Sequence, residues 1–162
     1  MRLAIVSDTH MPRGARDLPA ACVERLLAAD AILHCGDFMR PQVLERFQAL
    51  GPPLHAVFGN VDDAAVRTAL PERRVVHAAG ARIGMIHDPG PASGRLARLR
   101  HGFPDADAVV FGHTHMPQHA EADGFQIFNP GSPTERRRAP AHTMGVATIR
   151  DGGIVFELVA VR

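Results

Sequence analysis

Leu3-Ala4-Ile5-Val6-Ser7-Asp8-Thr9-His10 places an apolar run directly before polar residues of the kind that bind metal ions. A short apolar run closed by a polar turn is typical of a buried strand. The pattern recurs at Ala31–Cys35 before Gly36-Asp37, and at Leu54–Phe58 before Gly59-Asn60. Three predicted strands therefore each end in a side chain that can donate an oxygen or nitrogen atom to a ligand.

Helical patterns separate these three strands. Residues 20–29 predict an amphipathic helix, and Pro41 opens a second helix running to about Leu50, because proline suits the first helical turn. The alternation of strand and helix implies right-handed crossovers and a parallel sheet. Ligands of such sheets bind beyond the carboxyl ends of the strands, which is where Asp8, Asp37 and Asn60 stand.

The second part of the chain predicts mainly antiparallel elements. Arg74–Ala79 and Ala81–Ile86 read as a hairpin around Gly80, and Ser93 is a plausible cap for a helix ending at His101. Five further strands are expected at 108–111, 118–122, 125–129, 143–150 and 154–161, with turn signals at Asp123-Gly124 and Asp151-Gly152-Gly153. We expect one domain over residues 1–162, built as two packed sheets with helices outside.

Composition narrows the classes of protein. The formal net charge of +1 gives no general reason to expect nucleic acid or an anionic membrane as a partner. The apolar run near the start is too short for a signal peptide, and no run approaches the ~20 residues of a membrane span. Cys22 and Cys35 form no disulfide or zinc-ribbon pattern, so we expect buried thiols and a cytoplasmic location.

Seven side chains behind predicted strands form a mixed nitrogen and oxygen donor set. They are Asp8, His10, Asp37, Asn60, His87, His113 and His115. Such a set without thiolates suits Mn, Fe, Zn, Co or Ni better than Ca or a soft metal. The residues alone do not choose among these metals. A lone histidine after a strand is usually hydrogen-bonded or exposed, and we keep that reading for the other histidines, with His34 as a candidate to support the site through a hydrogen bond.

Taken together, these fragments resemble the calcineurin-like metallophosphoesterase superfamily, and most of all its small bacterial and archaeal phosphodiesterase branch. The resemblance covers nearly the whole chain and includes Asn129-Pro130-Gly131-Ser132, which is similar to a loop of that branch. It implies a four-layer αββα sandwich of two mixed sheets flanked by helices. It also implies two divalent transition metal ions, for which manganese is our first choice.

The resemblance further implies a role for each of the seven residues. Asp8, His10 and His115 would hold one metal, Asn60, His87 and His113 would hold the other, and Asp37 would bridge them. We name Asp37, Asn60 and His113 as catalytic as well. The implied reaction is hydrolysis of a P–O bond by in-line attack of a metal-bridging hydroxide, most often on a phosphodiester.

Two positions depart from the family pattern. Many members have a histidine, thought to stabilise the transition state or protonate the leaving group, where this chain has Val61, and valine can do neither. Asp62 or Asp63 could assist, although a helix cap suits either better. Asp88 follows His87 where the family often has glycine, and it could orient His87 or cap the next segment.

Substrate contacts and competing functions complete the predictions. Arg13, Arg136 and Arg137 are candidate contacts to a small phosphoester substrate, because arginine can bind phosphate bidentately. Arg40, Arg95 and Arg98 could contact the phosphate for the same reason. No aromatic residues alternate with these arginines, so a nucleic-acid groove is not supported. The alternative to an enzyme is a catalytically weak metal-binding scaffold of the same fold, as in one eukaryotic relative. A homodimer is left open.

Overall fold

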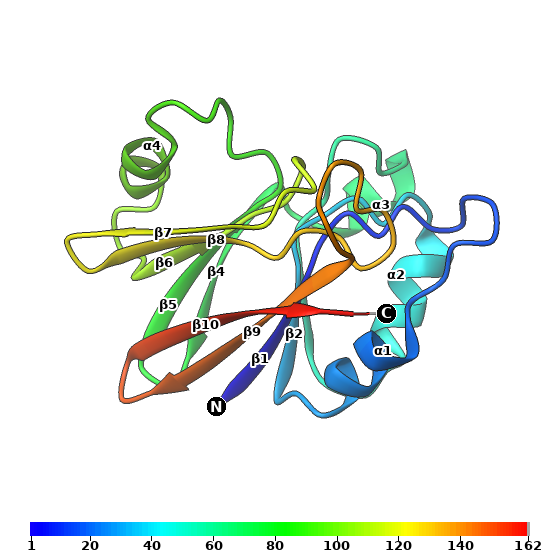
Figure 1. The fold of residues 1–162 in the computed structure, drawn as a ribbon, viewed down its shortest axis with the longest axis horizontal. Helices are drawn as coiled ribbons and strands as arrows, with labels where there is room; N and C mark the ends of the chain where they lie inside the picture. The colour runs from blue at the N-terminus through cyan, green and yellow to red at the C-terminus, as the bar shows by residue number, and fades with distance from the viewer. Residues whose placement is uncertain (162) are drawn as a thin grey trace.

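The computed structural model describes residues 1–161 as two five-stranded sheets packed face to face (Figure 1). The first sheet has the order β10-β9-β1-β2-β3. Its members are β1 (Arg2–Val6), β2 (Ala31–His34), β3 (Leu54–Ala56), β9 (Thr143–Arg150) and β10 (Gly153–Ala160). β1, β2 and β3 are parallel, with Ile5 beside Leu33 and Leu33 beside His55, whereas β9 and β10 are antiparallel.

The second sheet has the order β4-β5-β6-β8-β7 and is also mixed. Its members are β4 (Arg73–Ala78), β5 (Ala81–Ile86), β6 (Ala108–Val110), β7 (Gln118–Ala122) and β8 (Phe125–Asn129). β5, β6 and β8 run parallel, while β4 and β7 are antiparallel edge strands of the sheet. The predicted hairpins at Gly80, Asp123-Gly124 and Asp151-Gly152-Gly153 are all present.

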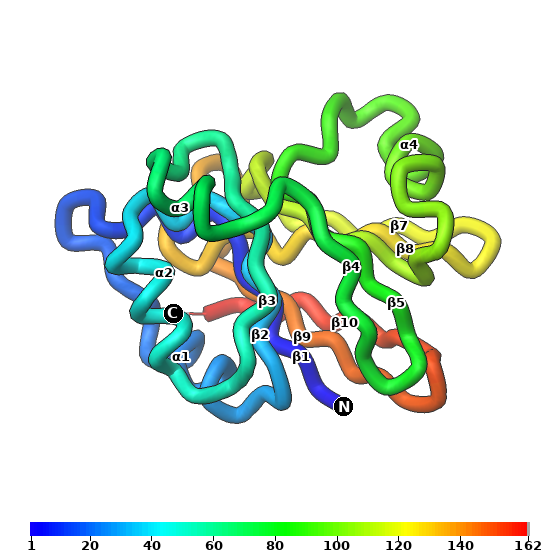
Figure 2. The backbone as a smooth tube through the Cα atoms, turned by 180° about the vertical axis from the view of Figure 1, so that it is seen from behind, coloured from blue at the N-terminus to red at the C-terminus, as the bar shows by residue number. Residues whose placement is uncertain are grey.

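The chain forms four layers because each sheet is apolar on both faces. One core lies between the sheets and includes Ile5, Leu33, Ile83 and Phe128. On the outer face of the first sheet, α1 (Ala20–Leu27) and α2 (Pro41–Gln48) bury Leu26 and Phe47. α4 (Arg95–Gly102) covers the second sheet, as Figure 2 shows from behind. The predicted αββα sandwich is confirmed.

Local differences from the sequence prediction lie at element ends. α3 (Ala64–Ala69) was not predicted as an element, although Asp63 caps it as expected, with its side chain accepting from Val66 N at 3.1 Å. The prediction of Ser93 as a helix cap was wrong. Gly94 occupies that position with φ of 66° and no side-chain cap, and Ser93 instead accepts a hydrogen bond from Arg98 through its carbonyl oxygen.

The parallel strands of both sheets end at the same side of the sandwich, the upper side in Figure 1. The loops after β1, β2, β3, β5 and β6 gather there, together with the loop between β8 and β9. At the opposite side the β4–β5 and β9–β10 turns meet, where Gly152 N donates to Ala79 O at 3.1 Å. One side of the sandwich is thus tied together, while the other carries the candidate site.

Candidate metal centre

The turn after β1 presents the first two candidate ligands from deep inside the protein. Asp8 is fully buried and His10 is 2% exposed, and both adopt positive φ, at 57° and 44°. Their backbone nitrogens donate to Gly36 O and Asp37 O, each at 3.0 Å, so the turns after β1 and β2 are bound together. Asp37, His113 and His115 also have positive φ, at 63°, 68° and 58°. Such backbone costs energy and is common at functional sites, where the surroundings enforce it.

Asp8, His10 and His115 form what we call the inner group. His115 Nε2 lies 3.4 Å from Asp8 Oδ1, and His10 Nε2 lies 3.9 Å from the same oxygen. Both Nε2 atoms are buried without a hydrogen-bond partner. Two orphaned imidazole nitrogens facing a buried carboxylate would be costly in an empty cavity, and they suit a divalent cation.

Asn60, His87 and His113 form the outer group. Asn60 Oδ1 lies 3.0 Å from His87 Nε2 and 2.8 Å from His113 Nδ1. His87 is buried, whereas His113 is half-buried and Asn60 is exposed. All three donor atoms thus converge at the mouth of the site. A cavity of about 240 Å³ beside it is lined by Phe58, Gly59, Asn60, Arg67, Glu72, Ile86, His87 and Asp88.

Asp37 stands between the two groups. Its Oδ2 atom lies 3.3 Å from His10 Nε2 and 3.3 Å from His87 Nε2. Its other oxygen accepts a hydrogen bond from Val61 N at 3.0 Å, which fixes the carboxylate plane. Asp8, Asp37 and His87 also offer ligand atoms within 4.8 Å of one another, as do Asp8, His10 and His115. The structure therefore brings all seven predicted residues into one cluster.

The charge balance of the cluster favours a cation. Burial lowers the pKa of His10, but the nearby carboxylates of Asp37 and Asp8 outweigh it and raise the pKa of His10 to about 9. Burial raises the pKa of Asp37, yet the hydrogen bonds of His10 and His87 hold that pKa well below its usual range. Burial also lowers the pKa of His115, which favours the neutral ring that a metal ligand needs. The carboxylates thus attract positive charge, which a divalent ion can supply.

Glycines let the ligand turns approach one another. A Cβ atom on Gly59 would overlap Asp37 Oδ1, and one on Gly112 would overlap Ser7 Oγ and lie 2.8 Å from Asp8 Oδ2. A Cβ atom on Gly36 would come within 2.8 Å of both Gly59 N and His87 Nδ1. The prediction that these glycines permit close approach is confirmed in physical terms: each lacks a side chain because a neighbouring ligand turn occupies the space.

Hydrogen bonds around the cluster hold the ligand turns. His34, predicted as a supporting residue, accepts from Gly36 N through Nδ1 and contacts Thr9 Oγ1 through Nε2, each at 3.2 Å. The expectation of a helix cap was wrong for Asp62, because Asp63 caps α3. The Asp62 carboxylate accepts from the backbone nitrogens of Asp37, Met39 and Gly59 at 3.1, 2.6 and 2.7 Å, which ties the turns after β2 and β3 together.

The structure shows what Asp88 and Val61, the two residues that depart from the family pattern, contact. Asp88 does not orient His87; Asp88 Oδ1 accepts from Gly90 N at 2.8 Å, whereas Cys35 O lies 2.7 Å from His87 Nδ1. The alternative in which Asp88 shapes the following turn is therefore confirmed. Val61 is 40% exposed at the rim, so its side chain offers an apolar surface beside Asn60.

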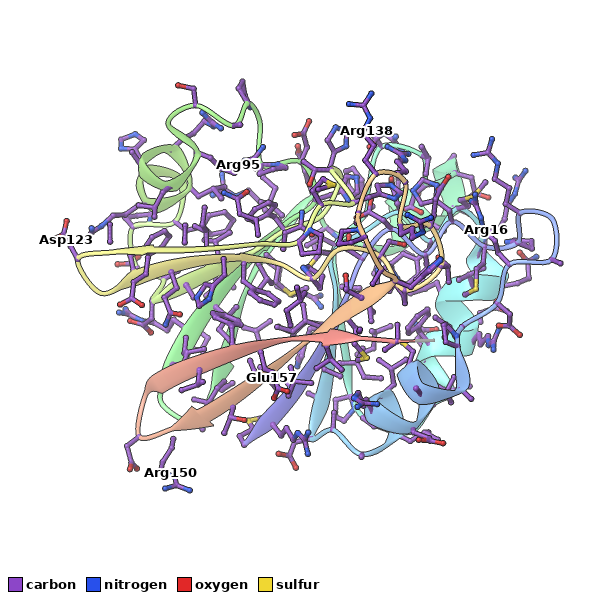
Figure 3. All side chains as sticks on the ribbon, viewed as in Figure 1. Arg16, Arg95, Asp123, Arg138, Arg150 and Glu157 are labelled. Carbon is purple, nitrogen blue, oxygen red and sulfur yellow. The ribbon has the colours of Figure 1, made fainter. Side chains whose placement is uncertain are left out.

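The arginines divide into those that build loops and those near the site. Arg95 and Arg98 donate to Gly90 O and Pro89 O, both in the loop after His87, and Figure 3 shows Arg95 between that loop and the second sheet. Of the three candidate substrate contacts, Arg13 is exposed, and Arg136 donates to Ala139 O within its own loop. Arg137 is close enough for its charge to act on His115, and it lines a cavity of about 360 Å³ with Thr114, Met116 and Arg138.

Sequence reasoning missed Glu135, which follows the predicted Asn129–Ser132 loop. Its Oε2 atom lies 3.4 Å from His10 Nδ1, and its carbonyl oxygen lies 2.5 Å from His115 Nδ1. No spacing or periodicity connects Glu135 with His10, which stands far away in the sequence. The only signal in the sequence is its position shortly after Asn129–Ser132, the segment that resembles a loop of the family.

Comparison with known proteins agrees with the cluster. A model of the calcineurin-like phosphoesterase superfamily domain matches residues 1–152. The chain belongs to this superfamily. It is 34% identical over 140 residues to a probable metallophosphoesterase of Methanothermobacter thermautotrophicus, which covers 85% of this chain and 80% of the relative. It is 25% identical over 144 residues to a phosphodiesterase of Methanocaldococcus jannaschii, covering 81% and 83% respectively.

Among solved structures, wild-type Vps29 from Entamoeba histolytica in complex with Zn²⁺ matches with a TM-score of 0.78. The identity is 23% over 99% of each chain, so this likeness shows the fold alone. Membership of the superfamily supports metal binding and phosphoester hydrolysis as the general activity. Among residues 1–161, no helix has the length and apolar character needed to cross a membrane.

Proposed function

We propose that this chain is a dinuclear metal-dependent phosphodiesterase. The observation that carries the proposal is the position of Asp37, whose Oδ2 atom is 3.3 Å from both His10 Nε2 and His87 Nε2. A carboxylate in this position can contact a cation held by the inner group and another held by the outer group. Similarity to a phosphodiesterase supports the choice of diesters. Manganese is our first choice of metal, ahead of nickel, iron, cobalt and zinc.

Two bound cations would lower the pKa of a water molecule and neutralise charge on the phosphoryl oxygens. The residues of this chain do the positioning. Asp8, His10 and His115 hold the inner side, while Asn60 and His113, at the solvent boundary, face an incoming phosphoester. The small size of the cavity beside Asn60 and His87, about 240 Å³, suits a small substrate. Val61 supplies no proton to the leaving group, so substrates with good leaving groups should react best.

The direct test measures hydrolysis of bis-p-nitrophenyl phosphate by the purified protein with Mn²⁺, and of p-nitrophenyl phosphate in parallel. We expect the diester to react faster, and Asp37→Ala to remove the activity. Asp123→Ala is the matched control, because Asp123 lies at the exposed β7–β8 turn far from the site (Figure 3). Absence of activity with Mn, Ni, Co, Fe and Zn would overturn the proposal.

A second candidate is a weakly catalytic scaffold. The exposed Val61 at the rim favours it, and so does the fold shared with Vps29, whose name denotes vacuolar protein sorting. Wild-type protein that binds metal stoichiometrically yet hydrolyses neither ester would support this candidate. Light scattering would check the homodimer, and the two free, buried cysteines support our proposal of a cytoplasmic location.

A further inference from the structure

We propose that Glu135 is a positioning residue that sets both histidines of the inner group, through its side chain for His10 and through its backbone for His115. The inference rests on the proposed function, because it assumes that the inner group holds a metal. Glu135 stands in the loop between β8 and β9 and is not one of the seven candidate ligands.

The side chain of Glu135 faces the far side of the His10 ring. Oε2 is 3.4 Å from His10 Nδ1, while His10 Nε2 points to Asp8 and Asp37. Oε2 is buried and makes no hydrogen bond among the described residues, so the N–H of His10 Nδ1, 3.4 Å away, is the donor available to it. Its second oxygen accepts from Arg16 Nη2 at 2.9 Å, which fixes the direction of the carboxylate.

The backbone of Glu135 serves the second histidine in the same way. Its carbonyl oxygen lies 2.5 Å from His115 Nδ1, leaving His115 Nε2 directed at Asp8 Oδ1. A carbonyl oxygen only accepts hydrogen bonds, so this contact requires the proton on Nδ1 of His115. The Glu135 carbonyl therefore selects the His115 tautomer whose Nε2 lone pair points into the site, and the Glu135 carboxylate favours a proton on Nδ1 of His10 in the same way.

The loop is fastened to the β1 turn so that this arrangement holds. Ser132 Oγ donates to Asp8 O at 2.8 Å and accepts from Glu135 N at 2.8 Å. Thr134 Oγ1 donates to Thr9 O at 2.6 Å. The backbone of the positive-φ turn carrying Asp8 and His10 is thus held by the same loop that orients the histidine rings.

Histidines that bind a metal usually donate their other ring N–H to a carboxylate or a carbonyl, and losing such a partner typically weakens metal binding about 10–100-fold. We expect Glu135→Ala to weaken Zn²⁺ binding at one of the two sites by that factor, measured by competition with a chromophoric chelator. Glu135→Gln keeps the length and an acceptor oxygen, so its loss should be smaller. Arg16→Ala, which leaves the carboxylate in place, should change the affinity less than about fivefold.

The ¹⁵N chemical shifts of the histidine ring nitrogens distinguish a positioning role of Glu135 from a purely structural one. In ¹⁵N spectra of the Zn²⁺-loaded protein, Glu135→Ala should change the shifts of His10 and leave those of His115, because the Glu135 carbonyl remains. Wild-type affinity together with unchanged His10 shifts in Glu135→Ala would overturn the inference. If Glu135→Ala does not fold, Glu135→Met, which keeps the bulk of the side chain and removes the acceptor oxygens, decides by the same two measurements. Wild-type protein that binds no Zn²⁺ would instead refute the proposed function.

Discussion

The inner and outer groups of the metal centre are built differently. Asp8, His10 and His115 are at most 2% exposed, and their rings or backbone are held by the β8–β9 loop that contains Glu135. Asn60 and His113 stand at the solvent boundary, and a cavity lies beside Asn60 and His87. Under the proposed function, the inner group would therefore bind a metal tightly, and the outer group would contact the substrate.

The position of one outer ligand depends on a residue of the inner group. Asp8 Oδ2 accepts from His113 N at 3.0 Å, so the inner carboxylate also positions the backbone of an outer ligand. Asn60 makes no such contact with the inner group among the hydrogen bonds of residues 1–161. Loss of an inner ligand should therefore damage both groups, whereas loss of an outer ligand should damage one.

The largest effect is expected from Asp8→Ala compared with Asn60→Ala. We expect Asp8→Ala to retain almost no metal and Asn60→Ala to retain about one ion per chain, measured by elemental analysis after gel filtration. Both should lose more than about a hundredfold in diester hydrolysis, exceeding the usual effect of residues that act through a ligand. Asp123→Ala should behave as wild type. One retained ion in Asp8→Ala would contradict the expected dependence of the outer group on the inner group, because the two groups would then bind metal independently.

A second prediction tests the tight packing behind the inner group. In Gly112→Ala the new Cβ would overlap Ser7 Oγ and press on Asp8 Oδ2, and such overpacking costs about 1–3 kcal/mol. We expect a lower free energy of unfolding in urea and weaker metal binding. Gly102→Ala is the control, because the nearest atom to its Cβ, Arg73 Nη2, is 3.6 Å away. Equal results for both variants would show that the inner group tolerates displacement.

The same contrast shows how far the sequence could predict the site. Each of the seven candidate ligands follows an apolar run, so local pattern and the rule for parallel sheets place them at one edge. The supporting contacts have no such signal. The sequence suits Asp62 to a helix cap, yet its carboxylate accepts from three backbone nitrogens, two in the turn after β2 and one in its own turn after β3. Glu135 reaches His10 across most of the chain, a pairing that only the packed sheets create.

Charged side chains were the hardest to interpret. The sequence makes Arg95 and Arg98 candidate phosphate contacts, but their guanidinium groups donate to carbonyl oxygens of the loop after His87. Arg40 pairs with Asp63 at 3.7 Å. An arginine in a loop looks the same in the sequence whether it binds a ligand or the backbone, since the acceptor is not encoded nearby. The N-cap of α4 is likewise Gly94 and not Ser93, whose carbonyl oxygen accepts from Arg98.

A third prediction concerns His34, which lies beneath the inner group. Burial, followed by the charge of His87, holds the pKa of His34 well below 6.5 in the folded protein. Because the folded pKa is depressed, its contribution to stability is present above pH 6.5 and is lost as pH falls towards the folded pKa. For metal-free protein, the free energy of unfolding should fall about 1.4 kcal/mol more per pH unit below 6.5 in wild type than in His34→Gln.

His77→Gln is the control for this titration, because His77 is exposed on β4. His10 and His87 also titrate in the metal-free protein and are present in all three chains, so the difference from wild type reports the loss of His34 together with its charge coupling to these two rings. Urea unfolding at several values between about pH 5 and pH 7 gives the slopes. Parallel curves for wild type and His34→Gln would mean that His34 takes up a proton without unfolding, and that the floor of the inner group is less rigid than its contacts indicate.

The smallest effect is expected at the outer rim. Comparing Arg137 with Arg13 distinguishes an arginine that acts on the substrate from one that is merely exposed. Arg137 lines the cavity of about 360 Å³ that includes Thr114, which stands between His113 and His115. Its charge can therefore act on a phosphoester held by the outer group, while solvent limits the interaction to about 1 kcal/mol. Arg137→Ala should raise KM up to about fivefold with little change in kcat, since charge at the rim favours bound substrate and transition state equally. Arg13→Ala should leave both constants unchanged. A fall in kcat in Arg137→Ala would place the guanidinium on the reacting phosphate itself. The outer group of Asn60, His87 and His113 would then gain a member from the β8–β9 loop.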